Sequence, residues 1–312
     1  TDVFSVFDGL FNRTVSANLG MSYSVSNVLA EAGLANIMRW VPFRIDEQTL
    51  RNRIKNKMIR PTTIPQTLDE LQIEQAIARE ALRLALIHHK SLATGLKGVQ
   101  QERTISDVFE QQTSGKTLID MLKLDLIVGS GGILSHAPRR IQSMLMMVDA
   151  YEPMGCTRLS VDSIFMMPHL GVLSTINEKA ATDVFVRDCM VYLGTCVAPI
   201  GQGKDGDLCA DYEITWPDGK TMKEPLKFGE LRLFPLESGK QATIKVQPAK
   251  GVNMGSGAGV AVTKEVHGGV VGLLLDGRGR PLKLPADQPG RVTALTKWFN
   301  AVGLYPGPSI ER

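Results

Sequence analysis

The first residues of the chain carry the pattern of a β-hairpin. Residues 1–7, TDVFSVF, intersperse apolar with polar side chains, Asp8-Gly9 is a strong turn signal, and a second run extends over residues 13–19. Residues 21–34 then predict a helix, with serines at its start and Gly33 near its end. The expected order is strand, strand, helix, so the chain is expected to begin inside a sheet.

A helix is predicted over residues 46–58, where apolar positions recur at helical spacing. Asp46 is the candidate cap, and Leu50, Ile54 and Met58 share one face. The other faces carry four basic side chains, Arg51, Arg53, Lys55 and Lys57. They form either an ordinary solvated surface or a basic rim over an anionic ligand.

A longer, largely buried helix is predicted to begin at a capping box formed by Thr67 and Glu70. His88 and His89 lie near its end, and as neighbours they point to different sides of a helix, so they are not expected to bind a metal together. Residues 97–116, rich in Gln, Ser, Thr and charge, are expected to form a surface loop.

The most informative stretch is DLIVGSGGILSHAP, residues 125–138. It predicts a buried strand over 124–128, a loop of Gly129, Ser130, Gly131 and Gly132, and a helix over 139–151. No Lys follows the glycines as in a P-loop, and Leu134 stands where a dinucleotide fingerprint has its third glycine. The loop is either shaped for close backbone approach to a nucleotide or a tight turn between strand and helix.

The second part of the chain has the pattern of an all-β module. Short alternating runs are separated by turn signals such as Pro217-Asp218-Gly219, and the glycines of residues 251–259 precede no capped helix, which favours turns over a phosphate loop. A last helix is predicted over 291–302. The predicted division is 1–188 for an α/β lobe, 189–285 for a β-sandwich or small barrel, and 286–312 for the C-terminal helix and tail.

Composition narrows the function without naming it. The chain is 43% hydrophobic and 21% charged, and its net charge of +3 is too small to favour global binding to nucleic acid or a membrane surface. No apolar run approaches the roughly 18–20 residues that span a bilayer, and the N-terminus lacks the layout of a signal peptide, so a cytoplasmic protein is expected. The four cysteines form no Cys-x-x-Cys pair and are expected to be buried free thiols.

The order of hairpin, helix, inserted helical region, long helix and V-G-S-G-G resembles the second lobe of the actin-like (ribonuclease H-like) ATPases. In that superfamily a strand followed by Gly-Gly carries the adenosine motif, which Gly129, Gly131 and Gly132 match. Its second phosphate motif ends in Gly-Gly-x-Thr-x-Asp and an apolar strand, and the opening TDVF resembles the tail of that motif. This likeness implies that Thr1 contacts phosphate and that Asp2 supports Mg²⁺ or a water.

Four blocks make the resemblance narrower: TDVFSV, RTVSANLGMSYS, DLIVGSGGILSHAP and GGVVGLLLDGRGRPLKLP. They are similar to the glutamate-mutase accessory family called MutL, which is unrelated to the mismatch-repair protein of that name. The resemblance implies an actin-like ATPase that uses ATP/ADP with Mg²⁺ and acts as a reactivating chaperone for an adenosylcobalamin-dependent aminomutase. It also implies that the first lobe lies outside these 312 residues, so this chain alone is expected to be inactive.

Two other classes of function remain open. Thr1 is a candidate nucleophile of an N-terminal-threonine hydrolase, in which the terminal amine acts as base. Alternatively, the chain is a non-catalytic protein-binding module whose glycine loop is only structural.

Overall fold

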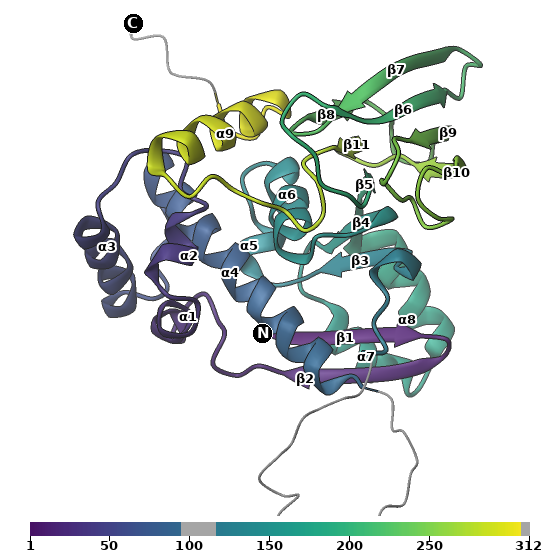
Figure 1. Ribbon diagram of the computed structural model, residues 1–312. Helices are drawn as coiled ribbons and strands as arrows, with labels where there is room; N and C mark the ends of the chain where they lie inside the picture. Colours follow the sequence, from purple (N-terminus) through teal and green to yellow (C-terminus); the bar gives the residue numbers. More distant parts are fainter. Residues whose placement is uncertain (95–116, 307–312) are drawn as a thin grey trace, which may run out of the picture.

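The computed structural model describes residues 1–94 and 117–306, which form a central mixed sheet with helices on one face and a second sheet on the other (Figure 1). The central sheet has the order β3-β4-β5-β11-β8. Its strands are β3 (Leu126–Gly129), β4 (Gly155–Asp162), β5 (Met190–Ala198), β11 (Gly272–Asp276) and β8 (Leu231–Phe234). All five residues of β11 are buried, as expected for an inner strand covered on both faces.

The second sheet is antiparallel, with the order β10-β9-β6-β7. Its strands are β6 (Leu208–Thr215), β7 (Thr221–Lys227), β9 (Gln241–Pro248) and β10 (Val262–His267). Exposed and buried residues alternate strictly along β9, so one of its faces contacts solvent and the other packs against the core. The inner face shares a core with Val197, Leu273 and Leu275 of the central sheet, which makes a two-layer sandwich.

The predicted β region is therefore present and has a hydrophobic core of its own, but not all of its strands lie in a separate sheet. Strand β5 pairs with β4, β11 pairs with β5, and β8 pairs with β11. Residue 189 thus does not separate two sheets, because three strands that follow it extend the sheet begun by β3 and β4. The sandwich forms between that extension and the second sheet.

The helices confirm most of the predicted segments. They are α1 (Val25–Ala32), α2 (Leu34–Met38), α3 (Glu47–Ile59), α4 (Leu68–Leu92), α5 (Gly132–Ser135), α6 (Arg140–Tyr151), α7 (Met167–Ser174), α8 (Glu178–Val184) and α9 (Gln288–Ala301). Asp46 caps α3, and the predicted capping box of Thr67 and Glu70 opens α4. The helix predicted over 21–34, with Gly33 near its end, is present as α1, which ends at Gly33 with a φ of 76°. The short helix α2, which was not predicted, begins directly after Gly33.

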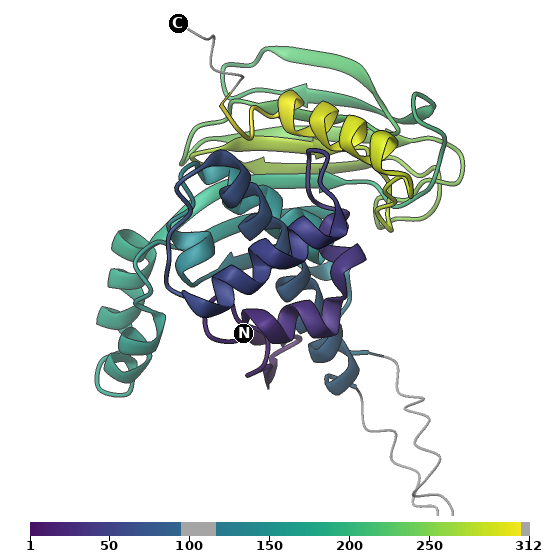
Figure 2. The same ribbon diagram turned by 90° about the vertical axis from the view of Figure 1, so that its left-hand side faces the viewer.

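Helices α4, α6 and α9 share the main hydrophobic core with the central sheet, whereas α7 and α8 form a helical hairpin that projects from the body (Figure 2). The region 97–116, predicted as a surface loop, lies outside the described residues. Over the described part of the chain, no helix combines the length and apolarity needed to cross a membrane.

Strands β1 (Asp2–Phe7) and β2 (Leu10–Val15) form the predicted hairpin, but they make a two-stranded sheet of their own. The chain therefore begins inside a sheet, as expected, although this sheet is separate from the central one. Two histidines of α4 hold the hairpin through side-chain hydrogen bonds: His88 to Ser16 at 2.8 Å, and His89 to Thr14 and Ser5, each at 2.8 Å. Burial lowers the pKa of His89, which favours its neutral form and a role in packing.

All four cysteines are free thiols, as predicted. Cys189, Cys196 and Cys209 are buried, and Cys156 is partly exposed. Burial raises the pKa of Cys209 to about 12 and that of Cys156 to about 11, so both are protonated and unreactive at neutral pH. The described residues contain no cluster of metal-ligating side chains.

The block GGVVGLLLDGRGRPLKLP ends in a buried network of charges. Asp276, at the end of β11, accepts hydrogen bonds from Arg278 Nε and Nη2 at 2.9 Å and from Arg280 Nη2 at 2.7 Å. Asp149 of α6 lies 2.7 Å from Arg79 Nε and 2.8 Å from Arg278 Nη1, although the second contact lacks hydrogen-bond geometry. These five side chains are fully buried and tie the central sheet to α4 and α6.

The glycines of the same block lie where two backbones approach closely. A Cβ on Gly269 would be 2.3 Å from the carbonyl carbon of Leu193 in β5. Gly272 pairs with Gly194 in the parallel ladder of β11 and β5, and a Cβ on Gly194 would meet the Gly272 carbonyl oxygen. The block is thus explained by packing of β11 between β5 and β8.

Candidate functional site

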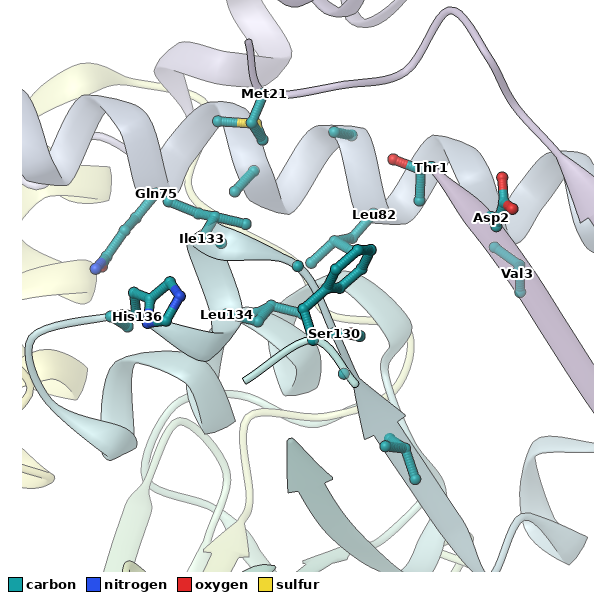
Figure 3. A pocket seen from close by; sticks show the side chains of 18 of the residues that line it. Thr1, Asp2, Val3, Met21, Gln75, Leu82, Ser130, Ile133, Leu134 and His136 are labelled. Atoms are coloured by element: carbon teal, nitrogen blue, oxygen red, sulfur yellow. The ribbon is translucent and has the colours of Figure 1, made fainter. Parts of the chain in front are cut away.

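A cavity of about 1660 Å³ brings together the candidate ligand residues at the N-terminus and in the glycine loop. Thr1 and Asp2 lie on one wall and Ser130 on another (Figure 3), and Gly129, Gly131 and Gly132 also line the cavity. Small-molecule sites enclose about 300–1,000 Å³. The cavity is therefore larger than one nucleotide requires.

The glycine loop follows the carboxyl end of β3, as predicted, and α5 begins directly at Gly132. Its glycines serve different purposes. At Gly129 there is no room for a side chain, because a Cβ would lie 2.6 Å from Met147 Sδ. Gly131 has a backbone φ of 95°, which residues other than glycine rarely adopt. Gly132 has neither constraint, because its Cβ position is open space. The last glycine therefore leaves room beside the loop that a side chain would fill.

On the opposite wall, Thr1 and Asp2 are already engaged with protein groups. The Thr1 ammonium donates to the carbonyl oxygens of Ser16 at 3.0 Å and Leu19 at 2.7 Å, and the Thr1 hydroxyl also donates to the Leu19 carbonyl. Burial lowers the pKa of the Thr1 amine. The Asp2 carboxylate accepts from Arg13 Nη2 at 2.9 Å, and both side chains remain partly exposed. A ligand or metal at Asp2 must therefore compete with Arg13.

Of the four basic residues on α3, Lys57 lines the cavity, whereas Arg51, Arg53 and Lys55 do not. The Lys57 ammonium contacts the Glu74 carboxylate and the Thr63 carbonyl oxygen. Among the described residues of the lining, Arg13 of β2 is the other Lys or Arg side chain. The basic face of α3 is thus mostly a solvated surface, and one of its lysines is placed to meet an anionic ligand.

Sequence reasoning did not single out the loop that follows β4. In the parallel ladder Gly129 pairs with Val161, so the next residues are Ser130, the first after β3, and Asp162, the last of β4. Asp162 is fully buried, and Ser130 Oγ donates to its Oδ2 at 3.4 Å. Phe165, three residues further on, lines the cavity. An acidic residue directly after an apolar strand is the signal that could have drawn attention to this loop.

The fold and cavity define a mixed α/β protein with a glycine-rich strand-to-helix loop open to a ligand-sized space. A family model described as MutL protein matches residues 1–189, which contain both cavity walls. The chain belongs to this family, the MutL proteins related to glutamate mutase and not the mismatch-repair MutL. Comparisons with curated proteins and with solved structures found no match.

Proposed function

We propose that this chain forms the carboxyl-terminal portion of an ATP-dependent accessory protein that reactivates an adenosylcobalamin-dependent aminomutase. The observation that carries the proposal is the single cavity whose two walls hold Thr1-Asp2 and the Gly-Ser-Gly-Gly loop. Family membership supports an accessory role for glutamate mutase. In the proposed arrangement the glycine loop lies against the adenosine, Thr1 contacts phosphate, and Asp2 supports Mg²⁺ or a water.

The residues fit the nucleotide better than they fit the metal. The open position at Gly132 and the cations Arg13 and Lys57 suit a planar base with an anionic tail. The acidic residues on the described lining are Asp2 and Glu74, and each is paired with a cation. Mg²⁺ is commonly held by one or two carboxylates together with substrate phosphates. We infer that the remaining groups come from a first lobe that completes the cleft.

Replacing Gly132 by Val is expected to weaken ATP and ADP binding by at least about tenfold, the equivalent of about 1.4 kcal/mol. A Cβ at this position would meet nothing within 4 Å, and Gly132 lines the cavity, so the substitution is expected to retain the fold. Isothermal titration calorimetry on the full-length gene product measures the effect. Gly171→Val is the matched control, because Gly171 is also unobstructed and does not line the cavity. Equal nucleotide affinities of Gly132→Val and Gly171→Val would show that the glycine loop is not part of the binding site.

The 312-residue chain alone is expected to bind adenine nucleotide weakly and to release phosphate from ATP no faster than background. The full-length protein is expected to do both, and a corrinoid mutase should co-purify with it and dissociate on addition of ATP. Rapid turnover by the short chain would contradict the two-lobe proposal. Failure of the full-length protein to bind nucleotide would favour a non-catalytic binding module.

A further inference from the structure

The loop between β4 and α7 places the aromatic side chain of Phe165 in the cavity, and the backbone of this residue is strained. Phe165 has a φ of 59°, in the left-handed region that bulky residues rarely occupy. Phe165 is 54% exposed, although the next residue, Met166, packs against the small core of α7 and α8. A strained residue that leaves its ring exposed in a cavity points to a functional role.

A buried carboxylate fixes this loop in place. Asp162 Oδ1 accepts hydrogen bonds from the backbone N–H groups of Ile164 at 3.4 Å and Met166 at 3.2 Å, and Oδ2 accepts from Met167 N–H at 3.1 Å. The Asp162 side chain thus holds the backbone on both sides of Phe165. Since Oδ2 also accepts from Ser130 Oγ, the same carboxylate sets the position of Phe165 relative to the glycine loop.

The cavity divides its chemistry between its walls. The hairpin and the end of α3 bring Arg13, Lys57, Thr1 and Asp2, which suit the charged part of a ligand. The glycine loop offers backbone with no side chain larger than that of Ser130, and Phe165 offers an uncharged aromatic face on the same cavity. Planar nucleobases commonly bind by stacking on an exposed aromatic ring of this kind.

We propose that Phe165 is the residue on which the base of the bound nucleotide stacks, with Asp162 as its positioning residue. This role rests on the proposed function, since it requires a nucleotide in the cavity. It assigns base recognition to the β4–α7 loop and leaves the triphosphate to the opposite wall. Binding of inorganic tripolyphosphate therefore does not depend on Phe165.

The test compares ATP with tripolyphosphate on the full-length protein by calorimetry. Phe165→Ala is expected to raise the Kd for ATP roughly tenfold and to leave that for tripolyphosphate unchanged. Phe165→Gly should behave like Phe165→Ala, which separates loss of the ring from loop strain, because glycine accepts a φ of 59° freely. Phe165→Trp should retain affinity, with a nucleotide-dependent change in fluorescence that the wild-type protein lacks.

Phe11→Ala is the matched control, because Phe11 is an exposed phenylalanine of β2 that does not line the cavity. If Phe165→Ala binds ATP as tightly as the wild-type protein while Gly132→Val does not, the stacking role is wrong and the proposed function stands. Equal losses for ATP and tripolyphosphate would also overturn the stacking role. A wild-type protein that binds neither probe would overturn the proposed function together with this inference.

Discussion

Asp276→Asn is expected to lower the free energy of unfolding by about 3–5 kcal/mol, the cost of removing one partner from a buried ion pair. The side chain is fully buried, and its two oxygens accept from both Arg278 and Arg280. An amide of the same shape removes the counter-charge of the buried Arg280 guanidinium and one of the two counter-charges of Arg278, which keeps Asp149. Urea denaturation followed by circular dichroism measures the loss.

The matched control is Asp183→Asn, which removes an exposed ion pair with Lys179 in α8 and should cost about 0.5 kcal/mol or less. The pH dependence gives a second check. Although burial opposes its charge, the guanidinium groups of Arg278 and Arg280 hold the pKa of Asp276 well below its usual range. A depressed folded-state pKa gives stability that is complete above the unfolded pKa of about 4 and is lost only below it.

The difference in stability between the wild-type protein and Asp276→Asn should therefore be constant from pH 7 to about pH 5 and shrink only in stronger acid. A difference below about 1 kcal/mol at neutral pH would show that the network contributes little to stability. A difference that already falls between pH 7 and pH 5 would show that Asp276 titrates near neutrality, contrary to its paired geometry.

Features set by neighbouring residues were predictable from the sequence. The hairpin follows from Asp8-Gly9, the start of α4 from Thr67 and Glu70, and the glycine loop from its place after an apolar strand. In each case the hydrogen bonds or the turn involve residues only a few positions apart. The same holds for the strand signals that became β6 and β9, since alternation needs only one buried face.

Features set by distant partners were missed. Nothing local in β5 shows that it pairs with β4 and β11, so the predicted β module was separated from a sheet that it extends. The role of Asp162 likewise depends on Ser130, which lies in the loop after β3. The short helix α2, which begins directly after Gly33 and packs against α3 and α4, was not predicted either.

The block GGVVGLLLDGRGRPLKLP illustrates this difference most clearly, because its glycines mark it in the sequence but only the structure explains them. Strand β11 enters the sheet between β5 and β8, and the chain before it crosses β5 at close range. The nearest atoms to a Cβ on Gly269 are all backbone: the carbonyl carbon of Leu193 at 2.3 Å, the Gly194 nitrogen at 2.4 Å and the Leu193 carbonyl oxygen at 2.5 Å. Backbone of an inner strand cannot turn aside as a flexible side chain can.

Gly269→Ala is therefore expected to destabilise the protein by about 3 kcal/mol, at the upper end of ordinary overpacking costs. Gly171→Ala, in the exposed helix α7, adds the same methyl group where nothing lies within reach, and should be neutral or stabilising by up to about 1 kcal/mol. Thermal melts of both variants measure the contrast. If Gly269→Ala melts with the wild-type protein, the approach of this segment to β5 is looser than the structure describes. If both variants have a melting temperature below that of the wild-type protein, the added methyl groups lower stability by a mechanism other than contact with β5.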